Sequence, residues 1–194
     1  MLQIQPDMAF EKDAPKSARP STLSARRHRR HLCPSTTLRS QGHLAEVAYS
    51  IAPDIGEATQ ETERAAAYLS LLSVEIGLKS ILEKAGVPVD KIRARSHQIR
   101  ALLKDVDRVK MDVVISPGVP TEVSASRIGA ITVEFANAIS TVGDLLDAQG
   151  VLTSTYPNEI RYGDVLINFP SRSLALAALG VVNFAESHWD TLKQ

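Results

Sequence analysis

The chain has 194 residues, of which 44% are hydrophobic and 23% charged, and its formal net charge is zero. These values are ordinary for a soluble globular protein, and the length suffices for one domain with a core and a tail. The single cysteine, Cys33, excludes an intrachain disulfide and favours a reducing cytoplasm. No apolar run approaches the roughly 20 residues of a membrane span, so we expect no membrane partner.

Charge is divided unevenly along the chain. Residues 1–43 hold eight Lys and Arg against three Asp and Glu, whereas the remainder holds 14 against 19. The acidic remainder argues against a broad nucleic-acid surface. Residues 1–42 are rich in Pro, Ser, Thr and Arg without apolar periodicity, which predicts a disordered basic tail. We therefore expect the ordered domain to span residues 43–194, with a first helix that is interrupted at Pro53.

A long buried helix is predicted over residues 64–85. Its apolar residues recur at three- and four-residue spacing, which is the period of one helical face. They are Tyr68, Leu71, Leu72, Leu78, Ile81 and Leu82. Further apolar residues extend onto a second face, so we expect neighbouring elements on two sides. Gly86 followed by Pro88 is a pattern that ends a helix.

The next predicted element is an amphipathic helix over residues 97–106, with Ser96 as its N-cap. Residues 109–120 resemble a loop, because two prolines and a glycine near the end of the segment leave no room for a sheet partner.

A second long helix is predicted from Thr121 or Ser124 to about Gln149, because apolar residues keep the helical period there despite many β-branched side chains. Residues 151–170 form an irregular connection, and a last helix begins at Ser171 or Ser173 and reaches Leu192. The expected fold class is therefore all-α: a four- or five-helix up-and-down antiparallel bundle with a disordered N-terminal tail.

The patterns of common metal and nucleotide sites are missing from the sequence. There is no pair of cysteines, no H-E-x-x-H pattern and no Gly-rich loop followed by Lys. His188 is interpreted as a surface or partly packed residue rather than a ligand. We therefore expect neither a metal nor another cofactor.

Glu75 and Lys79 are polar residues within the apolar central helix, spaced four apart in the order that favours an ion pair. An ionised carboxylate on a buried face costs several kcal/mol unless it is paired. We predict that the Glu75 carboxylate lies within hydrogen-bond reach, directly or through one water, of at least one basic group. The candidates are Lys79, His97, Arg100 and Arg161. Such a cluster either fixes helix packing or acts in catalysis, and the spacing leaves both roles open.

Three segments carry a family resemblance: YLSLLSVEIGLKSILEKAG in the central helix, SHQIRALL after it, and TYPNEIRYGD before the last helix. Together they resemble the HEPN domain superfamily over roughly residues 44–192. The family-like positions are Glu75, Lys79, His97, Arg161 and Tyr162. The resemblance implies a helical bundle that usually dimerises. It also implies one of two activities, because many members are metal-independent endoribonucleases and others bind nucleotides or partners without cleaving RNA.

The sequence departs from the family's ribonuclease pattern, which is an Arg, four to six residues of any kind, then a His near the last helix. Arg93 precedes His97 by only three intervening residues, and Arg172 is too far from His188. The one spacing that matches lies in the Arg-rich tail, where chance matches are expected. This departure counts against ribonuclease activity.

Three functional hypotheses follow. The leading one is a HEPN-like binding or partner module of a toxin–antitoxin or phage-defence system. It would be a homodimer, with an antitoxin or a nucleotidyltransferase as partner and RNA or a nucleotide as ligand. The second is a metal-independent endoribonuclease that uses His97 as the base and Arg100 or Arg161 as the cation beside the phosphate. Its binding residues would be Glu75, Lys79 and Tyr162. The third is a purely structural dimerisation bundle.

Overall fold

The computed structural model describes residues 34–53, 59–116, 119–135, 138–148, 156, 160 and 171–193. Contacts divide the chain into Met1–Arg30 and His31–Gln194, and every described residue belongs to the second unit. Most of the predicted tail, residues 1–33, thus lies outside the described residues. The first helix begins at Pro34, inside the segment assigned to the tail, so helical structure starts before residue 43.

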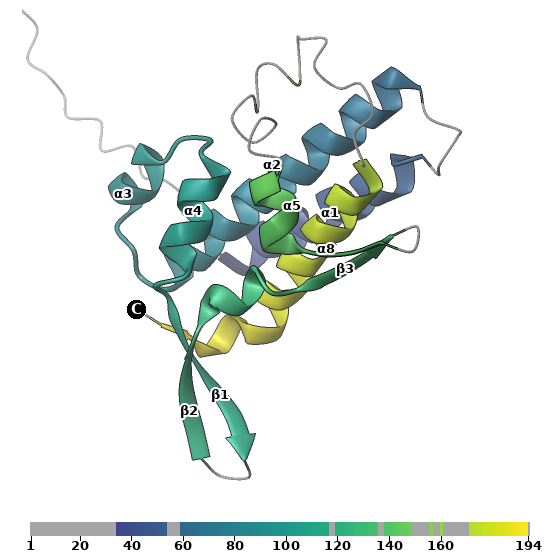
Figure 1. Cartoon of the computed structure of the whole chain (residues 1–194). Coiled ribbons are helices and arrows are strands. Elements are labelled where there is room, and N and C mark those ends of the chain that lie inside the picture. The colour runs from purple at the N-terminus through teal and green to yellow at the C-terminus, as the bar shows by residue number, and fades with distance from the viewer. Residues whose placement is uncertain are drawn as a thin grey trace, which may run out of the picture. The chain divides into compact units, whose positions relative to one another are not determined.

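Helices make up most of the described chain, as predicted (Figure 1). They are α1 (Pro34–Ile51), α2 (Gln60–Lys84), α3 (Val89–Ala94), α4 (Ile99–Val106), α5 (Val142–Ala148) and α8 (Ser171–His188). Helices α1, α2 and α8 pack against one another, and α3 and α4 pack against α2 as well. The core therefore surrounds α2.

The predicted central helix is confirmed as α2. Thr59 caps its start, because the Thr59 hydroxyl accepts a hydrogen bond from the Thr62 backbone N–H at 3.3 Å. Gly86 ends it with a φ of 84°, a left-handed conformation that glycine adopts without steric cost. The predicted apolar stripe is partly corrected. Its fully buried members are Leu71, Leu78, Ile81 and Leu82, whereas Tyr68 and Leu72 are only partly buried.

By length and composition α2 could cross a membrane, which corrects the expectation that no apolar run reaches that length. A core helix passes the same test, and 67% of the most apolar window of α2 is buried inside the protein. Its packing against α1, α4 and α8 accounts for this composition, because a helix covered on several sides is apolar on several sides.

Antiparallel β-structure occupies much of the region where a loop and a long helix were predicted. It also includes the end of the predicted last helix, which stops at His188 rather than reaching Leu192. The strands are β1 (Lys110–Ser116), β2 (Val119–Ser124), β3 (Thr132–Phe135), β4 (Ala138–Thr141) and β5 (Leu192–Lys193). Strands β2, β1 and β5 form one sheet in that order, and β3 pairs with β4 in another. Short 3-10 helices, η1 (Ala125–Ile128) and η2 (Trp189–Thr191), connect these elements. The prediction of an all-α bundle is therefore wrong in this region, where α5 and the short 3-10 helix η1 are the helical parts described within the predicted helix.

Two physical reasons explain this error. Pro120 lies opposite Val114 on β2, an edge strand of the described sheet, and edge strands are the positions in a sheet that tolerate proline. Ser116 on β1 is paired with Val119 on β2. Turn-forming residues between two paired strands indicate a hairpin rather than a loop. In the segment 121–149 the β-branched residues favour strands, and Val133 is buried between exposed neighbours, as strand alternation requires.

The β3–β4 hairpin is closed at its base by two backbone hydrogen bonds. The Val142 N–H donates to the Ile131 carbonyl at 2.9 Å, and the Gly143 N–H donates to the Gly129 carbonyl at 2.8 Å. A Cβ on Gly143 would lie 3.0 Å from the Gly129 carbonyl oxygen. The start of α5 thus meets the end of η1 at a distance that only glycine allows without a backbone shift.

Replacing Leu78 with Ala tests the packing of α2. Leu78 is fully buried, so we expect Leu78→Ala to lower the free energy of unfolding by roughly 2–5 kcal/mol. Leu72→Ala on the same helix is the matched comparison and should cost less, because Leu72 is only partly buried. Urea unfolding followed by circular dichroism measures both. Equal losses, or an unchanged midpoint for Leu78→Ala, would contradict the described burial.

Candidate functional site

Glu75 is a carboxylate inside the apolar environment of α2, with 4% of its surface exposed. The Lys79 Nζ lies 2.6 Å from Glu75 Oε1, one helical turn along α2. The His97 Nδ1 lies 3.0 Å from Oε2 and 3.2 Å from Oε1. The prediction that Glu75 finds a basic partner is therefore confirmed, and among the described candidates Lys79 and His97 fulfil it.

His97 reaches α2 from the connection between α3 and α4. Helix α4 begins at Ile99, and its N-cap, Gln98, makes no side-chain capping bond. Ser96 has a φ of 49°, which is unusual for a residue other than glycine. The prediction of Ser96 as the N-cap of a helix starting at His97 is thus wrong. Ser96 instead lies in the turn between α3 and α4, and His97 precedes α4 with its Nδ1 bonded to Glu75.

Tyr156 is a fourth member of this cluster that the sequence interpretation missed. It is buried, and its side chain is hydrogen-bonded to Glu75. The Tyr156 ring centroid lies 5.9 Å from that of His97 at 83°, an edge-to-face contact, and 5.8 Å from that of Tyr68. Tyr156 lies in the segment TYPNEIRYGD that carries the family resemblance, so the segment was identified but not this tyrosine.

The other predicted site residues are not placed in the cluster. Arg100 is exposed in the first turn of α4. Arg161 and Tyr162 lie outside the described residues. The side chains of Glu75, Lys79, His97 and Tyr156 together form the Glu75 cluster.

Two opposing effects act on the pKa of Glu75. Burial raises this pKa, but hydrogen bonds from Lys79, His97 and Tyr156 lower it by more. The net result is a pKa below the ordinary value of 4.5, so Glu75 is ionised at neutral pH. An ionised carboxylate only accepts hydrogen bonds, so the proton of the His97–Glu75 bond belongs to Nδ1.

This protonation state defines what the cluster can do chemically. With Nδ1 carrying a proton toward Glu75, a neutral His97 has its lone pair on Nε2, the nitrogen that would act as a base. The His97 side chain is 52% exposed, so solvent reaches it. Equally, Glu75 joins α2 to the segment before α4 and to Tyr156, which is a structural tie between parts distant in sequence. Among the described residues, no three His, Cys, Asp or Glu side chains gather as metal ligands would.

Comparison with models of protein families, with curated proteins and with solved structures found no match.

The pH dependence of stability tests the Glu75 cluster. A carboxyl group with a lowered folded pKa stabilises the fold above its unfolded pKa, and this contribution disappears as pH falls through the folded pKa. Glu75→Gln should therefore lower the free energy of unfolding at pH 7 by about 1–3 kcal/mol, and by progressively less as the pH falls below 4.5. Urea unfolding at a series of pH values from 7 into the acid range measures this. Glu83→Gln, an exposed position on α2, is the control. A Glu75→Gln loss that is independent of pH would refute the described network.

Proposed function

We propose that this chain is a HEPN-like helical binding module that acts through a partner protein, in a toxin–antitoxin or phage-defence system of a reducing cytoplasm. One observation carries the proposal. The buried Glu75 carboxylate is bonded by Lys79, His97 and Tyr156, so the family-like residues that are described bond to one another. This arrangement supports a role in holding α2 against the α3–α4 connection, a role that needs no substrate.

The hairpins support an association through strand edges. Among the described strands, β2 pairs only with β1, and β3 and β4 pair only with each other. Ile139 on β4 is 74% exposed, the largest value among the exposed large apolar residues. Unpaired strand edges are templates for pairing with another chain. We therefore assign the β3–β4 hairpin as the contact of a homodimer, which then binds an antitoxin or a nucleotidyltransferase.

The dimer is tested by light scattering at micromolar concentration. The expected mass is twice 21.1 kDa. Ile139→Lys should shift the protein toward the monomer mass, because it places a charge at the proposed contact. Val89→Lys, at an exposed apolar position on α3, is the matched control and should leave the dimer intact. A monomeric wild-type protein removes the dimer from the proposal, and an unaffected Ile139→Lys dimer removes the hairpin contact.

A second candidate function is metal-independent RNA cleavage, and the half-exposed His97 favours it. In this reaction the His97 Nε2 removes the proton from a ribose 2′-hydroxyl group, and the 2′-oxygen attacks the adjacent phosphorus. The bond to the 5′-oxygen then breaks and that oxygen takes up a proton, which leaves a 2′,3′-cyclic phosphate and a 5′-hydroxyl end. Glu75 would orient the imidazole, and Arg100 or Arg161 would stabilise the charge on the phosphorane.

A cleavage assay separates the two candidates. A fluorescent single-stranded RNA is incubated with wild-type protein and with His97→Ala in EDTA, and the products are separated on a gel. Under the binding-module proposal we expect no cleavage above background by either protein. Cleavage to cyclic-phosphate ends that is lost in His97→Ala, while the variant keeps a folded circular dichroism spectrum, would overturn that proposal in favour of a ribonuclease.

A further inference from the structure

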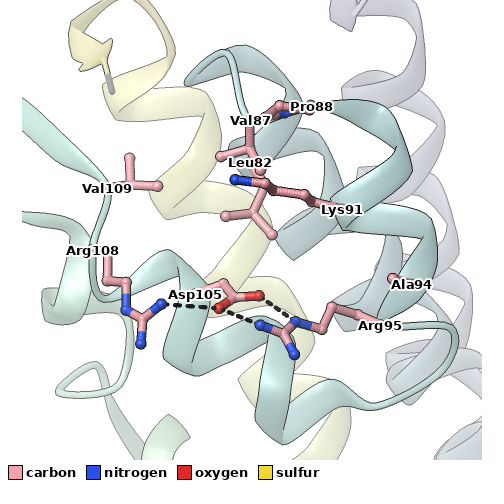
Figure 2. Close-up of a pocket in the computed structure, with 9 residues that line it drawn as sticks. All are labelled: Leu82, Val87, Pro88, Lys91, Ala94, Arg95, Asp105, Arg108 and Val109. Carbon is pink, nitrogen blue, oxygen red and sulfur yellow. Dashed lines mark hydrogen bonds and ion pairs between the residues drawn. The ribbon is translucent and has the colours of Figure 1, made fainter.

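A pocket of about 520 Å³ lies between the end of α2, helix α3 and the end of α4, and none of the Glu75 cluster lines it (Figure 2). Part of its wall is aliphatic and belongs to the core. Leu82 and Val109 are buried, and Val87 packs against the core beside them. Because these side chains are held by the core, the wall is present before any ligand arrives. The volume is in the range of pockets for small molecules.

Charged side chains form the rest of the lining. Asp105 accepts two hydrogen bonds from Arg95, from Nε at 2.5 Å and from Nη2 at 3.0 Å (Figure 2). Its Oδ1 also lies 3.8 Å from the Arg108 Nη1. Figure 2 shows both guanidinium groups converging on this one carboxylate. Asp105 thus holds two cations at the same wall of the pocket and neutralises only one of them.

Lys91 adds a third cation from α3. Within the part of the chain that the structure describes, no acidic side chain pairs with Lys91. Three cations and one carboxylate leave two positive charges in the lining. The guanidinium of Arg95 has five N–H donors and gives two of them to Asp105, so donors remain for a ligand.

We propose that this pocket binds a small phosphate monoester with an apolar body. A phosphate monoester carries about 1.5–2 negative charges at pH 7, which matches the two uncompensated positive charges. A carboxylate would compensate only one. Phosphate oxygens accept hydrogen bonds from Arg and Lys together, and the aliphatic wall takes the rest of the molecule. The assignment goes beyond the proposed function, because it uses neither the Glu75 cluster nor the hairpins.

Titration calorimetry with three probes tests the ligand chemistry on the full chain. Phenyl phosphate combines a phosphate monoester with an apolar ring, inorganic phosphate lacks the ring, and benzoate keeps the ring but carries a single negative charge. We expect phenyl phosphate to bind at least tenfold more tightly than either of the others. Equal affinities for phenyl phosphate and inorganic phosphate would overturn the apolar part of the assignment. Equal affinities for phenyl phosphate and benzoate would overturn the phosphate part.

Three variants place the binding in the pocket. Lys91→Met and Arg108→Gln keep most of the side-chain length and remove a charge at exposed positions, so both should fold and weaken phenyl phosphate binding at least tenfold. Lys104→Met removes an exposed charge on α4 that is not in the lining and should change nothing. Unchanged binding in the first two variants, or an equal loss in all three, would overturn the site. Neither outcome bears on the dimer mass or on RNA cleavage.

Discussion

A helix that is apolar on more than one face must be covered on more than one face, and α2 imposes this requirement on the rest of the fold. Helices α1 and α8 pack against it, and α3 and α4 bring the following segment onto it. Because α2 is enclosed, the ionised Glu75 carboxylate would destabilise the fold unless hydrogen-bond donors reached it. His97 and Tyr156 supply such donors. The packing around α2 and the geometry of the Glu75 cluster therefore depend on each other.

Local rules were enough to predict the elements that depend on helical period and on the cost of a buried charge. The central helix, the start of the last helix at Ser171 and the pairing of Glu75 follow from such rules. Strands β3 and β4 were missed because apolar spacing between residues 121 and 149 fits a helix, while the β-branched side chains there fit a strand. A strand is stabilised by its partner, and β1 pairs with β5, which lies about 80 residues away in the sequence.

At the Glu75 cluster and at the pocket, contacts between residues close in sequence could be predicted, and contacts that depend on tertiary packing could not. Lys79 is one turn from Glu75, whereas Tyr156 lies far along the chain and enters through tertiary packing alone. The pocket was not predicted because Arg95 follows the end of α3 whereas Asp105 lies on α4, and nothing in the spacing indicates that they meet. The bonds of Glu75 with Lys79 and His97 do not decide the chemistry of these residues, since the same bonds fit a structural tie and a catalytic base.

The closed base of the β3–β4 hairpin has a consequence for how this chain could change during evolution. Residues 131 and 142, and residues 129 and 143, are hydrogen-bonded, so the chain leaves the helical body and returns to it at one point. Lengthening a loop whose ends are already held together adds only about 0.6 kcal/mol of closure entropy for each doubling. Insertions at the tip of the hairpin are therefore tolerable, and surface recognition can diversify there. Gly143 is the opposite case, because any larger residue presses on the Gly129 backbone and would need a compensating change nearby.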